Sequence, residues 1–127
     1  MQIYFFSAGI VSVLVAVVHS LLGEFLIFKK LRGTGLVPTE SAPPLQSRNI
    51  RILWATWHLA SVFGLGFAAI LFAAAADHTS LDLFTIDAMI CAFAGGSVLV
   101  LIATKGKHPG WVGLLAVAVL VYLGSAA

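Results

Sequence analysis

Residues 3–28 read IYFFSAGIVSVLVAVVHSLLGEFLIF, an almost unbroken apolar run that decides the class of this protein. At 1.5 Å per residue, such a run is long enough to cross a hydrocarbon layer of about 30 Å as a helix. A secretory signal is the competing interpretation. However, no basic residue precedes the run, and apolar residues continue past any small-residue cleavage site. We therefore interpret this run as a membrane span.

The rest of the chain has the same character. Of its 127 residues, 61% are hydrophobic and 9% are charged, whereas about a quarter of residues are charged in soluble domains. Three more spans are expected, at 49–76, 81–103 and 110–125, with a polar loop over 29–48. The later connections are short and favour antiparallel neighbours. The prediction is an all-α, antiparallel up-down four-helix membrane bundle that forms a single transmembrane domain over 1–127.

The basic residues predict the orientation of this bundle. All seven lie beside the two loops that alternating spans bring to one face: Lys29, Lys30, Arg32, Arg48, Arg51, Lys105 and Lys107. The positive-inside rule makes that face cytoplasmic, so both termini are expected on the periplasmic side of a bacterial inner membrane. The basic residues anchor the chain beside the lipid bilayer, and this role explains the net charge of +2. The charge therefore needs no nucleic-acid partner to explain it, and none is expected.

Polar residues inside the spans form the candidate site. His19 and His58 lie about 15 Å and about 10 Å along their helices from the basic residues of the first loop. The two imidazoles are therefore expected at similar depth on neighbouring spans. Glu24 is expected nearer to the same boundary, and His108 begins the fourth span there. His78, in the outer loop, does not belong to this group.

Imidazole and carboxylate groups are common ligands of transition metals, and helical bundles build metal sites from inward-facing side chains. We predict a cofactor site with His19 and His58 at its core, and with Glu24 and His108 as further metal ligands. The cofactor would be haem b, held between the two core histidines, or a non-haem Fe, Cu, Zn or Mn ion. The expected supporting partners are Trp54, Ser20, Ser61 and Arg51.

Structural alternatives stand beside these roles. Glu24 is about 140° around its helix from His19, so the two side chains cannot both point straight at one centre. Glu24 would then reach toward lipid headgroups or pair with Arg51. His108 precedes Pro109 at a helix start, where it would serve as a cap.

Three functions are compatible with this pattern. The first is a redox or metal-handling role. If the protein is an enzyme, which the sequence leaves open, its natural substrate would be a lipophilic molecule such as a quinone or a lipid. The second is a cofactor-free accessory subunit of a larger membrane complex or homo-oligomer, docked through small residues. The third is a proton or ion conductor that uses Asp87 and Glu24 as intramembrane carboxylates.

Three stretches carry a family resemblance: VVHSLLGEFLIF, WATWHLASVFGLGFAAIL and KGKHPGWVGLLAVAVLV. They resemble a family of small four-span bacterial membrane proteins of uncharacterised function. In that family an HSxLGE stretch on span one precedes an AWHLTS-like stretch on span two. Here the second stretch reads TWHLAS, with Ala60 where a hydroxyl residue is expected. The resemblance implies the four-span fold and the importance of His19, Glu24 and His58, and it implies no activity.

Overall fold

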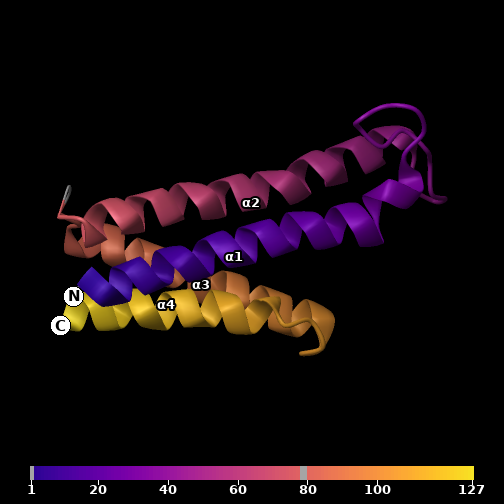
Figure 1. Ribbon diagram of the computed structural model, residues 1–127. Coiled ribbons are helices and arrows are strands. Elements are labelled where there is room, and N and C mark those ends of the chain that lie inside the picture. Colours follow the sequence, from indigo (N-terminus) through magenta and orange to yellow (C-terminus); the bar gives the residue numbers. More distant parts are fainter. Residues whose placement is uncertain (1, 78–79) are drawn as a thin grey trace. The chain divides into compact units, whose positions relative to one another are not determined.

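The computed structural model describes residues 2–77 and 80–127, and these contain four α-helices, one short 3-10 helix and no strand. The α-helices are α1 (Gln2–Leu26), α2 (Ser47–Ala75), α3 (Leu83–Thr104) and α4 (Gly110–Ala126), and the 3-10 helix η1 (Phe28–Leu31) follows α1 (Figure 1). The all-α prediction is therefore confirmed. His78 lies outside the described residues.

Three helices, α1, α2 and α3, are long and apolar enough to cross a membrane. These lengths and compositions are those of a membrane-spanning protein whose helices contact lipid. The fourth helix, α4, is equally apolar but has 17 residues, or about 25 Å of length, so its crossing stays a prediction. The four helices begin and end within two residues of the expected spans. The apolar run of the first span continues past Leu26, where the α-helix gives way to η1.

The chain divides into two compact units, and the single transmembrane domain stays a prediction. Unit 1 comprises residues 1–15 and 64–127, and unit 2 comprises residues 16–63. The helices α1 and α2 therefore each contribute one half to each unit.

In unit 1, small residues allow the helices to approach closely. A Cβ atom on Gly124 of α4 would lie 2.7 Å from Cε1 of Phe5 on α1, and one on Gly113 would lie 2.5 Å from Cγ2 of Val15. Ser12 of α1 donates a hydrogen bond of 2.8 Å to the carbonyl of Gly64 on α2. The core of this unit consists of Phe5, Ala8, Leu71, Ala74, Ile86, Met89, Phe93, Val117, Ala118 and Val121. Between helices in lipid, such close packing replaces the hydrophobic effect as the source of stability.

Both ends of α3 are capped. Asp82 precedes the helix, and its carboxylate accepts hydrogen bonds from the backbone N–H of Thr85 at 2.8 Å and from the Thr85 hydroxyl at 3.1 Å. These bonds lower the pKa of the exposed Asp82 below its usual value of 3.8. At the other end, Lys105 adopts the left-handed conformation with φ of 52°, and its N–H bonds to the carbonyl of Ile102.

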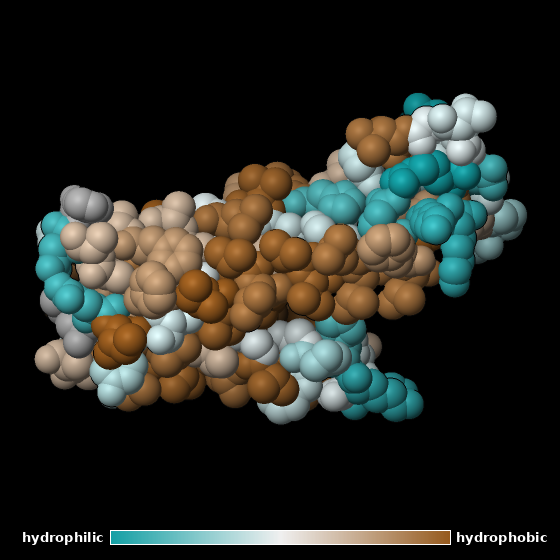
Figure 2. All heavy atoms as spheres, viewed as in Figure 1, coloured by the Kyte–Doolittle hydropathy of each residue, from teal (hydrophilic) through white to brown (hydrophobic). Residues whose placement is uncertain are grey.

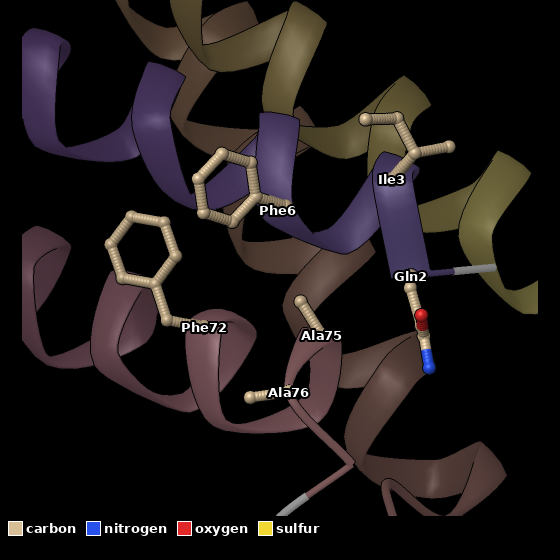
Figure 3. Close-up of a pocket in the computed structure, with 6 residues that line it drawn as sticks. All are labelled: Gln2, Ile3, Phe6, Phe72, Ala75 and Ala76. Atoms are coloured by element: carbon tan, nitrogen blue, oxygen red, sulfur yellow. The ribbon is translucent and has the colours of Figure 1, made fainter.

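Unit 1 also contains a pocket at the N-terminal end of α1. Figure 3 shows Phe6 of α1 and Phe72 of α2 on one side of it and Ile3 and Gln2 on the other, with Ala75 and Ala76 between them in this view. The ring centroids of the two phenylalanines are 5.5 Å apart. Among the described residues, the lining of this pocket is apolar apart from Gln2.

Unit 2 is a helical hairpin. It pairs the C-terminal half of α1 with the N-terminal half of α2, and η1 and the polar loop connect them (Figure 1). Phe28 and Ile50, at the base of the hairpin, are each 2% exposed. In Figure 2 hydrophilic residues gather at the loop end of this hairpin, whereas its flanks are mostly hydrophobic.

Candidate functional site

The candidate site lies between the two helices of the unit 2 hairpin. Ser20 of α1 donates a hydrogen bond to the hydroxyl oxygen of Ser61 on α2 at 2.8 Å. One turn further along α1, Glu24 accepts a hydrogen bond of 3.4 Å from Nε1 of Trp54. Further along α1 the contacts therefore involve earlier residues of α2, as in an antiparallel pair. They bring together polar residues 30 to 41 positions apart in sequence, and we call this line of contacts the polar seam: Ser20, Glu24, Trp54, His58 and Ser61.

His58 is held at this seam by Ser20, whose hydroxyl oxygen is 2.9 Å from Nδ1 of the imidazole. A serine hydroxyl has one proton, and that of Ser20 is directed at Ser61. In the tautomer that agrees with this direction, Ser20 accepts a proton from Nδ1 of His58. In the neutral imidazole this tautomer leaves the lone pair on Nε2, the nitrogen used to accept a proton or to ligate a metal.

That nitrogen lies 3.8 Å from Oε2 of Glu24. The distance exceeds that of a hydrogen bond, and two atoms that both carry lone pairs repel each other. A proton or another cation between them would turn this repulsion into attraction. The side chains of His58 and Glu24 are 27% and 24% exposed, so the pair is only partly shielded.

Glu24 is also paired with a cation from the loop. Its Oε1 contacts the guanidinium of Arg32, whose side chain is 23% exposed. The sequence suggested Arg51 as the partner, but Arg51 is exposed on α2. From the sequence, Arg32 serves only to predict which face of the bundle is cytoplasmic. The sequence contains a weak sign of the pairing, because Arg32 follows Glu24 by eight residues across the end of α1.

His19 occupies a different environment from His58. Its imidazole stacks on the indole of Trp57, with ring centroids 4.4 Å apart and an interplanar angle of 7°. Nε1 of Trp57 donates to the carbonyl oxygen of His19 at 2.9 Å. A Cβ atom on Gly23 would lie 2.1 Å from the same Nε1, so the absence of a side chain at Gly23 makes room for the indole. Trp57 therefore fills the space beside His19.

Aromatic rings surround the polar seam. The centroid of Trp54 is 5.0 Å from that of His58, and the two rings meet edge to face. The buried Phe28 of η1 lies 6.1 Å from His58 and 5.9 Å from Trp57, measured between ring centroids. The rings reduce the access of water to the imidazole, and electrostatic interactions at the seam are stronger as a result.

Two other candidate residues belong to unit 1. Nδ1 of His108 accepts a hydrogen bond of 3.0 Å from the backbone N–H of Gly110, the first residue of α4. This contact is the helix cap that the sequence left open. Asp87, six residues after Leu81, is exposed on α3.

The metal and haem ligands expected from the sequence stay predictions. Within residues 2–77 and 80–127, no three His, Cys, Asp or Glu side chains are grouped so that they could hold a metal ion. Each metal bond to nitrogen or oxygen is about 2.0–2.2 Å, so one ion could bridge the 3.8 Å between His58 and Glu24 with two protein ligands. For a haem between His19 and His58, the stacked indole of Trp57 would have to move. Haem therefore stays a prediction from the sequence.

Comparison of this chain with protein-family models, with curated proteins and with solved structures finds no match.

Proposed function

We propose that this protein transfers protons at a membrane, with His58 and Glu24 as the groups that bind the proton. The observation that carries this proposal is the connected seam in unit 2, which runs from Ser61 through Ser20 to His58 and on toward Glu24. Hydroxyl and imidazole groups in sequence can each accept one proton and release another. Ionisable groups inside apolar helices are costly, which makes them functional candidates by default.

The charges support this role. Protonation of Nε2 gives an imidazolium that donates toward Ser20 at one nitrogen and faces the Glu24 carboxylate with the other. Arg32 pairs with Oε1 of Glu24, and Oε2 faces Nε2 of His58, so the carboxylate attracts a proton at that nitrogen. Trp54 donates to the same carboxylate and orients it. We also propose that α4 crosses the membrane as a fourth span and that Asp87 is a further proton-binding carboxylate.

The orientation is part of the proposal. We place the loop between α1 and α2 in the cytoplasm of a bacterial cell and both chain ends in the periplasm, because every Lys and Arg flanks the first or the third loop. Reporter fusions at the C-terminus and within residues 33–46 test this arrangement. Activity of a periplasmic reporter within the loop would contradict it.

Proton flux into sealed vesicles tests the proposed function. Purified protein is reconstituted with a pH-sensitive dye inside the vesicles, and a potassium gradient with valinomycin supplies the driving force. We expect flux above that of empty vesicles and at least a tenfold loss in His58→Ala and in Glu24→Gln. His108→Ala is the matched control, because its imidazole belongs to unit 1, and it should retain the flux. Equal flux in all of these samples, or none above empty vesicles, would refute proton transfer.

A metal ion at the same pair is the second candidate, and the 3.8 Å separation of its two potential ligand atoms favours it. An absorption spectrum and elemental analysis of one purified sample for iron, copper, zinc and manganese test this candidate. Stoichiometric metal that is lost in Glu24→Gln would establish a non-haem centre. A Soret band that is lost in His19→Ala or His58→Ala would establish haem. A colourless, metal-free protein would exclude both.

A further inference from the structure

Four exposed cationic side chains lie at the loop end of unit 2, outside the polar seam. Lys29 and Lys30 belong to η1, and Arg48 and Arg51 lie in the first two turns of α2. Residues 16–63 contain five basic and two acidic residues. One of these acids, Glu24, is neutralised by Arg32 within the hairpin. The exposed surface at this end of unit 2 is therefore strongly positive.

The same end of the hairpin exposes apolar side chains. Phe25 and Leu26, in the last turn of α1, are 60% and 61% exposed. Nζ of Lys29 lies 6.0 Å from the centroid of the Phe25 ring, a cation–π distance. The ammonium is thus held directly beside apolar surface. Arg48 and Arg51, three residues apart on a helix, lie on one face of α2.

We infer that this surface binds the headgroups of anionic phospholipids such as phosphatidylglycerol. A lipid phosphate lies at the boundary between water and hydrocarbon, which is where cations beside exposed apolar side chains would meet it. A lipid satisfies both parts of the surface, because its phosphate pairs with the cations while its acyl chain covers Phe25 and Leu26. A soluble anion would satisfy only the first part. Hydrophilic residues gather over this end of the hairpin in Figure 2.

Electron paramagnetic resonance of spin-labelled lipids tests this inference. Full-length protein is reconstituted in phosphatidylcholine vesicles with a trace of spin-labelled phosphatidylglycerol or phosphatidylcholine, and the motionally restricted fraction gives the relative affinity. We expect a two- to fivefold preference for phosphatidylglycerol in the wild type. The preference should fall to about one in a Lys29→Gln, Lys30→Gln, Arg48→Gln, Arg51→Gln variant, and it should weaken in high salt.

The matched control is Lys105→Gln with Lys107→Gln, which removes two exposed cations of unit 1. This control should keep the preference. If the control loses it to the same degree, or if the wild type shows none, the assignment to unit 2 is wrong. The paired variants Lys29→Gln with Lys30→Gln and Arg48→Gln with Arg51→Gln should each lower the preference partly. These smaller changes keep the test informative if the fourfold variant does not fold.

Discussion

The hydroxyl oxygen of Ser20 on α1 lies 2.9 Å from Nδ1 of His58 on α2, and the tautomer of the imidazole decides which of the two groups donates. Since Ser20 directs its own proton to Ser61, Nδ1 carries the proton and Nε2 is left to face Glu24. In this arrangement, the serine on the neighbouring helix leaves Nε2 as the nitrogen of His58 that accepts a proton.

Replacement of Ser20 should disturb both of its contacts at once. We expect Ser20→Ala to lower the free energy of unfolding by about 1–2 kcal/mol, because it leaves Nδ1 of His58 without its partner. It should also lower the proton flux. Ser61→Ala is the comparison, because it preserves the contact between Ser20 and His58, and its effect should be smaller. Denaturant titration in detergent and the vesicle assay provide the measurements. Equal effects of the two variants would contradict the assigned tautomer.

A side chain at Gly23 should open the hairpin of unit 2. A Cβ atom there would lie 2.1 Å from Nε1 of Trp57, and the indole cannot move freely because it is stacked on His19. We expect Gly23→Ala to cost about 1–3 kcal/mol through overpacking, measured by thermal unfolding in detergent. In Gly66→Ala, the control on α2, the new Cβ atom meets nothing within 4 Å, and stability should be retained.

The pair formed by Glu24 and Arg32 should show a measurable coupling energy. Because both side chains are about a quarter exposed, we expect about 1 kcal/mol from a double-mutant cycle of Glu24→Gln and Arg32→Gln. The parallel cycle with Arg51→Gln should give a coupling near zero. Denaturant titration of the six proteins checks both values. A larger coupling to Arg51 than to Arg32 would show that the carboxylate takes its partner from α2.

The start of α3 should lose stability in acid. The lowered pKa of Asp82 means that its stabilising contribution is complete above the unfolded-state value of 3.8 and is lost as pH falls through the lower folded-state value. Hydrogen-exchange protection of the Thr85 amide, corrected for the intrinsic rate, should therefore decrease in strong acid. Asp82→Asn preserves a capping oxygen that does not titrate, so its protection should stay constant. A pH-dependent loss in that variant would point to another group.

The amino-acid sequence by itself determined the helices. Backbone N–H and C=O groups cannot remain unpaired in hydrocarbon, so apolar runs of about 20 residues form helices whatever their neighbours are. That rule is local, and it placed α1 to α4 within two residues of their ends. The same arithmetic of rise per residue brought His58 to the level of residues 19 and 20 on α1.

Only the tertiary structure decided which side chains meet. The choice of Arg32 rather than Arg51 as partner of Glu24 depends on the path of the chain through η1, and a polar loop has no periodicity from which that path can be read. The stacking of Trp57 on His19 depends on the missing side chain of Gly23 in the opposite helix. The contacts between α1 and α2 join residues 30 or more positions apart in sequence, where shape and hydrogen-bond geometry decide between partners of equal depth.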